Sequence, residues 1–115
     1  MIGMSDDKTS SVSPMRLTAA VAQSRIRKAA LVTANVKISF HAREQATTRE
    51  IFDVGVFRVL RGGYVDDAPV KTDFEGEWKC KITLKIRGGR TAGVVVIILP
   101  NGKLFVKTVE WEDLS

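Results

Sequence analysis

The clearest pattern in the chain is a strict alternation of apolar and polar positions over residues 78–86. The apolar set is Trp78, Cys80, Ile82, Leu84 and Ile86, and the polar set is Lys79, Lys81, Thr83 and Lys85. A period of two predicts a β-strand with one face on the core and the other in water. Successive lysines would stand about 7 Å apart on the wet face. Because like charges repel, this row indicates either a polyanion lying across the sheet or ordinary protection of a sheet edge.

The remainder of the C-terminal half predicts three more strands. Residues 64–71 contain a proline, which indicates an edge strand. Gly88-Gly89 provides a two-residue hairpin turn after the lysine-bearing strand. Residues 93–99 are apolar on both faces, as expected of a central strand, and residues 103–111 return after a Pro-Asn-Gly turn. The pattern therefore predicts a four-stranded antiparallel β-meander.

The N-terminal half predicts helices. Ser13 followed by Pro14 is a helix start, and an apolar stripe with steps of three and four residues continues to about Ala34. This stripe favours packing on the sheet, while docking into a partner's groove is the alternative use.

Two shorter helices are expected before the meander. Ser39 follows a short extended piece and caps a brief helix. Thr47 and Glu50 have the spacing of a capping box, which predicts a further helix ending at Gly62-Gly63. Asp53 is an alternative cap for that helix.

These elements predict an α+β fold, with N-terminal helices packed on one face of a four-stranded antiparallel β-meander. The other face is expected to be open and to carry the lysines. Residues 1–12 are polar and are expected to form a disordered tail. Residues 13–115 are expected to form a single domain, because 115 residues suffice for one hydrophobic core.

Composition excludes several kinds of site. One cysteine and one histidine cannot build a zinc site or an intrachain disulfide, and Cys80 falls on the inward side of its strand. No apolar run is long enough to cross a membrane. We therefore expect a cytoplasmic protein with no metal, no cofactor and no membrane association.

Charge is distributed unevenly along the chain. There are 18 lysines and arginines against 13 acidic residues, a formal net charge of +5. Residues 8–43 and residues 78–109 contain no acidic residue, and the acids concentrate at residues 66–77 and 110–113. Such segregation favours a nucleic-acid partner or an acidic protein segment, and it does not choose between them.

The order helix, short strand, two helices and meander resembles the RelE/ParE superfamily of small bacterial toxins. A closer resemblance is to an uncharacterised bacterial domain family near that superfamily, and the chain is also similar to MqsR-like and BrnT-like small toxins. Matching positions of the domain family's first motif are Ser39, His41, Ala42, Arg49 and Ile51, and departures are Gln45, Ala46 and Glu50, the last standing where glycine is usual. The resemblance implies a RelE-like fold, binding of RNA, in some members at the ribosome, and neutralisation by an antitoxin protein. It also implies a metal-independent mRNA endoribonuclease, although the sheet offers only Tyr64 and no glutamine for the family's usual polar residues.

Cleavage of RNA by its 2′-hydroxyl needs a base, an acid and cations around the phosphorus. His41 suits acid or base work because its unperturbed pKa is about 6.5, and Lys79 or Lys81 would serve if neighbouring cations lowered the lysine pKa. These three are the catalytic candidates. The alternative for His41 is a backbone hydrogen bond that fixes the start of its helix. Candidate nucleic-acid-binding residues are Arg43, Arg58, Arg61, Lys71, Lys85, Arg87 and Arg90.

Three functions are consistent with these residues. The first is a toxin-like RNA-binding protein that cleaves mRNA. The second is a non-catalytic module of the same fold that uses a basic sheet face for nucleic acid or an acidic partner. The third is a protein-interaction domain that docks through its first helix or an exposed strand edge. Oligomeric state is left open by the sequence.

Overall fold

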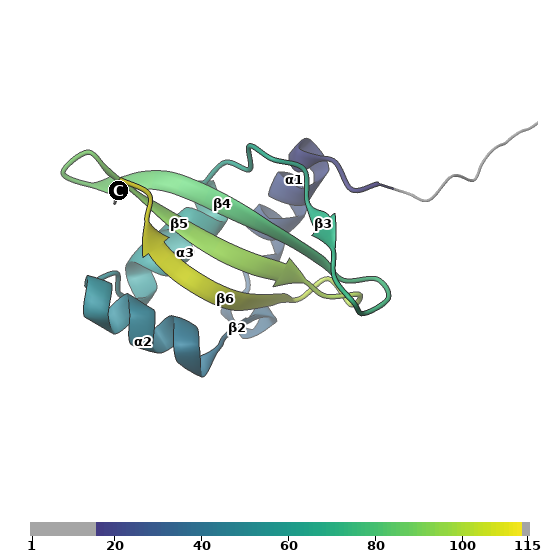
Figure 1. Ribbon diagram of the computed structural model, residues 1–115, viewed down its shortest axis with the longest axis horizontal. Helices are drawn as coiled ribbons and strands as arrows, with labels where there is room; N and C mark the ends of the chain where they lie inside the picture. Colours follow the sequence, from purple (N-terminus) through teal and green to yellow (C-terminus); the bar gives the residue numbers. More distant parts are fainter. Residues whose placement is uncertain (1–15, 114–115) are drawn as a thin grey trace, which may run out of the picture.

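The structure, a computed structural model, describes residues 16–113. This part of the chain forms an α+β fold with three α-helices and a five-stranded mixed sheet (Figure 1). The helices are α1 (Ala19–Ala29), α2 (Phe40–Arg49) and α3 (Asp53–Gly62), with a short 3₁₀ turn η1 (Thr33–Asn35). The strands are β2 (Val36–Ile38), β3 (Val70–Lys71), β4 (Trp78–Arg87), β5 (Arg90–Ile98) and β6 (Leu104–Trp111). The predicted tail at residues 1–12 and the predicted cap at Ser13 and Pro14 lie outside the described residues.

The strand order is β2-β6-β5-β4-β3. Strands β3 to β6 are joined by antiparallel pairs, and β2 adds a parallel strand beside β6. The prediction of a four-stranded, purely antiparallel sheet is therefore corrected to a mixed sheet of five strands. Three residues of β2 are too few to show a period, and their partner lies far along the chain at Leu104 to Val106.

The edge strand β3 is much shorter than predicted. Only Val70 and Lys71 pair with β4, and Tyr64 makes a separate antiparallel bridge to Thr83. Pro69 lacks an amide hydrogen and precedes this strand, which is consistent with its position at the sheet edge. The hairpin turn at Gly88-Gly89 and the central position of β5 are confirmed.

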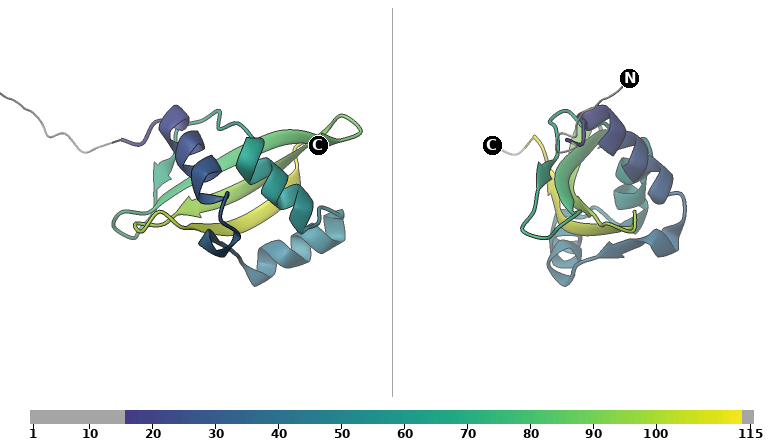
Figure 2. Two further views of the ribbon diagram at one scale, coloured as in Figure 1. Left: turned by 180° about the vertical axis from the view of Figure 1, so that it is seen from behind. Right: turned by 90° about the vertical axis from the view of Figure 1, so that its right-hand side faces the viewer.

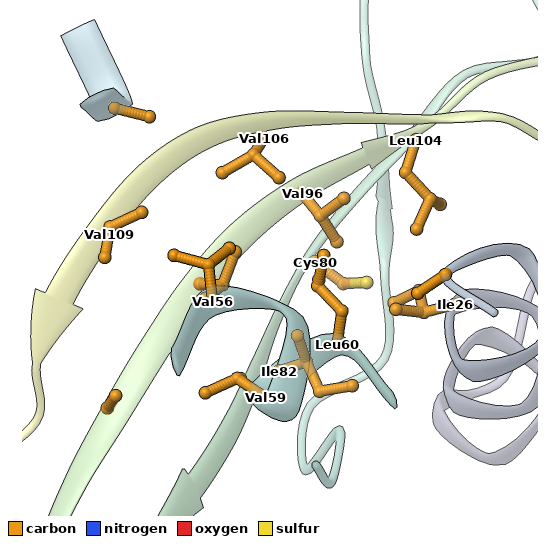
Figure 3. Close-up of a cluster of buried hydrophobic side chains, with 14 of the residues drawn as sticks. Ile26, Val56, Val59, Leu60, Cys80, Ile82, Val96, Leu104, Val106 and Val109 are labelled. Atoms are coloured by element: carbon orange, nitrogen blue, oxygen red, sulfur yellow. The ribbon is translucent and has the colours of Figure 1, made fainter. Parts of the chain in front are cut away.

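The helices cover one face of the sheet (Figure 2). Alternate β4 side chains point into the core beneath them, where Cys80 and Ile82 are buried, while Lys79 and Lys81 are exposed. Side chains from α1, α3, β4, β5 and β6 meet in one apolar cluster, which includes Ile26 (Figure 3). The predicted alternation of β4 is confirmed, and the face that carries its lysines has no helix over it.

Helix α1 is shorter than its apolar stripe predicted. Its N-cap is Thr18, whose hydroxyl accepts a hydrogen bond from the Val21 amide at 3.2 Å. At the other end, Asn35 donates its side-chain amide to the Ala29 carbonyl at 3.1 Å. This bond satisfies a carbonyl of the last turn, and the chain then enters η1 instead of continuing the helix to Ala34.

The boundary between α2 and α3 also differs from the prediction. The Ser39 cap is confirmed, because its hydroxyl accepts from the Ala42 amide at 3.0 Å. The capping box is wrong: Thr47 lies inside α2, and Glu50 ends that helix in the left-handed region at φ +57°. Helix α3 ends at Gly62 as predicted, but Asp53 is its first residue and not its cap: the N-cap is Phe52, which has no side-chain capping bond.

Candidate functional site

The face of the sheet opposite the helices carries the predicted lysine row, but one lysine is neutralised. The Lys81 ammonium lies 2.9 Å from a Glu112 carboxylate oxygen and 3.2 Å from one of Glu110. In the sheet register Gly93 on β5 pairs with Thr83 and with Glu110. A Cβ atom at Gly93 would collide with the Glu112 carboxylate and would lie 3.2 Å from a side-chain carbon of Lys81. The absence of a side chain at Gly93 thus makes room for this ion-pair cluster.

This cluster acts against the catalytic hypothesis for Lys81. The hydrogen bond to Glu112 raises the pKa of Lys81, and Glu110 adds to the increase. A lysine base needs a lowered pKa, so the expected lowering by neighbouring cations is wrong at Lys81. The contacts of Lys81 with Glu110 on β6 and with Glu112 just after it suit a structural link from β4 to β6.

The three catalytic candidates are not brought together. His41 is exposed near the start of α2, and α2 packs against β6. Lys79 and Lys81 are on β4, with β5 between β4 and β6. Within residues 16–113 the His41 side chain makes no hydrogen bond, so its alternative role in fixing the backbone is not observed either.

Several arginines predicted to bind nucleic acid instead hold backbone carbonyls. Arg61 donates to the Ala30 carbonyl at 2.8 Å and ties α3 to the end of α1. Arg87 donates to the Glu50 carbonyl at 2.7 Å, and Arg58 makes an exposed contact of 3.4 Å with a β4 carbonyl. These bonds leave fewer guanidinium donors for phosphate.

Two further arginines are paired with carboxylates. Arg90 lies 3.0 Å from Asp113, and its guanidinium sits 4.0 Å from the centroid of the Trp111 ring. The hydrogen bond from Arg90 lowers the pKa of Asp113. Arg43 lies 3.6 Å from Asp53, and both side chains are exposed, which makes this a weak surface contact.

Near the start of β4, one lysine each from β3, β4 and β6 lines a cavity, which we call the open-face cavity. Its volume is about 560 Å³, and its floor is formed by Ile97, Leu99 and Phe105. Lys71, Lys79 and Lys107 line it together with Asp73, Phe74 and Glu77. In the described part of the chain none of these three lysines forms an ion pair. The open-face cavity therefore combines apolar surface with ammonium groups and two carboxylates.

The loop over this cavity is held by its own hydrogen bonds. The Thr72 hydroxyl lies 3.1 Å from a Glu77 carboxylate oxygen and also accepts from the Phe74 amide at 3.1 Å. The Glu77 amide donates to the Phe74 carbonyl at 3.2 Å. Despite this anchoring the Phe74 side chain is 69% exposed. The loop thus presents an aromatic ring to solvent beside the lysines.

A second hollow, which we call the basic cleft, lies between the end of α1 and the β5–β6 turn. Its volume is about 410 Å³, and Arg25, Lys28 and Lys103 line it. Asn35 and Asn101 also contribute, and no carboxylate does. Sequence reasoning did not single out these three cations or Lys107. Their signal was present in the two acid-free stretches, but only the fold brings residues 25–28 next to residue 103.

The two hollows lie on either side of the β5–β6 turn and are therefore close together. Leu99 lines the open-face cavity, and Asn101, Gly102 and Lys103 line the basic cleft. In Figure 1 this is the end of the molecule where β5 points and where β3 and α1 lie. We call this region the basic end, defined by Arg25, Lys28, Lys71, Lys79, Lys103 and Lys107.

Among residues 16–113 no group of three or more His, Cys, Asp or Glu side chains is placed to hold a metal ion. No helix in this range is long and apolar enough to cross a membrane.

Residues 38–111 match the model of a family described as "Domain of unknown function (DUF4258)". The match runs from the end of β2 through β6, so α1 with Arg25 and Lys28 lies outside it. No curated protein matches the chain, and no solved structure does.

Proposed function

The chain belongs to the DUF4258 family, and we propose that it binds single-stranded RNA at the basic end. The observation that carries the proposal is the gathering of six cations around two adjoining hollows. Five of them come from the two acid-free stretches of the sequence, and Lys71 comes from the acidic stretch 66–77. Within the described residues none of the six is paired with a carboxylate. Unpaired cations along a groove attract a phosphate backbone by releasing its counterions.

Single-stranded RNA fits this surface better than a duplex. The open-face cavity places Phe74 and Phe105 between lysines, and single-strand binding sites combine a cationic groove with aromatic rings on which bases stack. In a duplex the bases are stacked on one another and cannot reach such rings. Double-stranded RNA is recognised mainly through its shape and its 2′-hydroxyls.

Fluorescence anisotropy with a labelled single-stranded RNA tests the proposal. We expect Lys79→Ala combined with Lys107→Ala to weaken binding at least roughly tenfold, because each substitution removes a charge-assisted hydrogen bond to a phosphate. Lys85, a nucleic-acid-binding candidate from the sequence, lines neither hollow: it is exposed on the same strand and face as Lys79 but pairs with Thr91 near the opposite turn. Lys85→Ala is therefore the matched control. Equal losses for the control and the double variant, or no binding at low salt, would contradict the proposal.

A toxin-like mRNA endoribonuclease with a RelE-like fold is the second candidate. It is supported by the arrangement of helices on one face of the antiparallel strands β4 to β6 and by the motif that begins at Ser39. The dispersal of His41, Lys79 and Lys81 makes cleavage by these three groups the weaker part of this proposal. Under it, the physiological partner is an antitoxin protein that covers the basic end with acidic residues.

The two candidates are separated by the fate of the RNA. A ribonuclease leaves shortened fragments after incubation and arrests bacterial growth when expressed without its antitoxin. A binding module leaves the RNA intact and growth unimpaired while retaining salt-sensitive affinity. If the chain binds no RNA but captures an acidic protein segment, the alternative of a protein partner replaces both.

A further inference from the structure

The open-face cavity is more than a place for phosphate, because its floor is apolar. Ile97 is 6% exposed and Phe105 is partly buried, although both belong to the face of the sheet without helices. The volume of about 560 Å³ falls in the ordinary range of small-molecule sites. A phosphate group alone would leave the exposed parts of Leu99 and Phe105, which are only partly buried, in contact with water. A flat, largely apolar group would cover them.

Two aromatic rings are available for such a group. Phe105 comes from β6 and lies in the floor, and Phe74 comes from the loop that follows β3. Phe74 is 69% exposed, and its ring packs in no core cluster of the described residues. Stacking of a nucleobase on an exposed phenylalanine removes apolar surface from water on both partners.

The carboxylates of the cavity narrow the choice of base. Asp73 and Glu77 line the same hollow as Lys79 and Lys107, and carboxylates repel phosphate. One oxygen of Glu77 is bonded to the Thr72 hydroxyl at 3.1 Å, which orients the group and leaves further acceptor positions open. A ligand that uses the whole cavity therefore needs N–H donors for a carboxylate and acceptors for an ammonium.

Guanine is the RNA base that carries both neighbouring N–H donors for a carboxylate and acceptors for an ammonium group. It offers two neighbouring N–H donors, at N1 and N2, and acceptors at O6 and N7. Cytosine and adenine each carry one amino group without a neighbouring N–H donor in the ring, and uracil carries a single N–H. From the residues that line the open-face cavity we infer that it holds one unstacked guanine base. Glu77 accepts from the N–H groups of the base, and Lys79 or Lys107 donates to its acceptors. This inference rests on the RNA binding proposed above and assigns that site its base.

The test uses the full chain and short uridine-rich RNAs that differ at one position, which is guanine, inosine or abasic. We expect the abasic RNA to bind roughly tenfold more weakly than the guanine RNA. Phe74→Ala should cause a similar loss with the guanine RNA and no further loss with the abasic RNA, because both changes remove the same contact. Phe74 is exposed, so its removal should leave the fold intact.

The carboxylate contact is tested separately. Glu77→Gln keeps the side-chain shape and an oxygen for Thr72, but it should reduce affinity for guanine RNA several-fold and abolish the preference for guanine over inosine, which lacks the N2 amino group. Glu75→Gln is the matched control, because Glu75 is exposed on the same loop and does not line the cavity. It should leave the preference unchanged.

The possible outcomes distinguish the guanine site from RNA binding at the basic end. If RNA binds with salt dependence but the guanine, inosine and abasic RNAs bind equally, the base site is overturned and RNA binding stands. If no RNA binds, guanosine 5′-monophosphate is titrated into the full chain and the amide chemical shifts are followed by NMR. Shifts around Phe74 and Phe105 would then support the base site and overturn RNA binding, and no shifts would overturn both.

Discussion

At the scale of single residues, Glu50 shows how one backbone angle sets a boundary. It ends α2 at φ +57°, in the left-handed region, and its amide donates to the Ala46 and Thr47 carbonyls. A residue with a side chain is strained in that region, whereas glycine is not. The capping-box spacing of Glu50 concealed this role, since a sequence pattern does not reveal the sign of φ.

Replacing Glu50 by glycine should therefore stabilise the protein. We expect Glu50→Gly to raise the free energy of unfolding by about 0.5–1 kcal/mol, after the greater flexibility of glycine in the unfolded chain is counted. Glu44→Gly makes the same chemical change at an exposed site inside α2 and should lower the free energy of unfolding by about 0.5–1 kcal/mol. Urea denaturation of the two variants measures both values. A loss of stability in Glu50→Gly would show that the left-handed backbone is not strained.

Cys80 is a residue whose environment was predictable, because the period of two alone places it inside. Burial raises the pKa of its thiol from 9.0 to about 11. Between pH 9 and about pH 11, therefore, the Cys80 thiol keeps its proton in the folded protein and loses it in the unfolded chain. The stability linked to this proton is fully present below pH 9 and is lost as the pH rises through about 11.

The consequence is a steeper alkaline loss of stability in the wild type than in Cys80→Ala. The difference should grow between pH 9 and about pH 11 and reach roughly 2–3 kcal/mol. Urea denaturation at a series of pH values measures it, with the free energy of each protein referred to its own value at pH 7. Parallel curves for the two proteins would mean that the thiol titrates normally.

At the scale of elements, local signals were sufficient where a pattern repeats and insufficient where two distant segments meet. The strands β4 to β6 were predicted from the alternation of β4 and the apolar run of β5, and their turns were predicted from Gly88-Gly89 and from Pro100-Asn101-Gly102. β2 has three residues and pairs with β6, more than sixty positions later, so nothing local reveals it. Likewise Lys81 meets Glu110 and Glu112 only because β6 folds back beside β5, and the local sequence around these residues does not reveal the contact.

The contact between α3 and β4 depends on Gly63. A Cβ atom added there would lie 2.7 Å from the Thr83 carbonyl oxygen and 2.8 Å from an Ile82 side-chain carbon. Gly63 also offers its own carbonyl to Arg27, whose Nη2 donates at 2.6 Å. A side chain at this position must push the end of α3 away from the sheet.

Gly63→Ala should therefore destabilise the fold by about 2–3 kcal/mol. Gly62→Ala is the neighbouring control: the nearest atom to its added Cβ would be a Leu84 carbon at 3.9 Å, and the residue lies in the last turn of α3. It should be neutral or stabilising by a few tenths of a kcal/mol. Thermal and urea unfolding of both variants give the comparison, and similar effects at the two positions would argue against a close helix–sheet contact.

At the scale of the whole molecule, the fold turns two separate acid-free stretches into one cationic region. The sequence predicted a basic row along β4, but the structure interrupts that row at Lys81. Six cations that are unpaired within residues 16–113 gather at one end of the molecule, while Lys85 lies near the opposite turn. Arg25 and Lys28 arrive there on α1, and Lys103 arrives on the β5–β6 turn. The candidate site was therefore predicted in chemical character and only partly in position, because its position depends on contacts between elements.

The most direct test of the central claim is the salt dependence of single-stranded RNA binding. If the six cations of the basic end contact phosphates, log Kobs should fall with log salt concentration with a slope of about −4, or about −0.7 per contact. Lys103→Ala should make the slope shallower by about 0.7, and Lys85→Ala should leave it unchanged. A slope near zero, or one that Lys85→Ala changes and Lys103→Ala does not, would contradict RNA binding at the basic end.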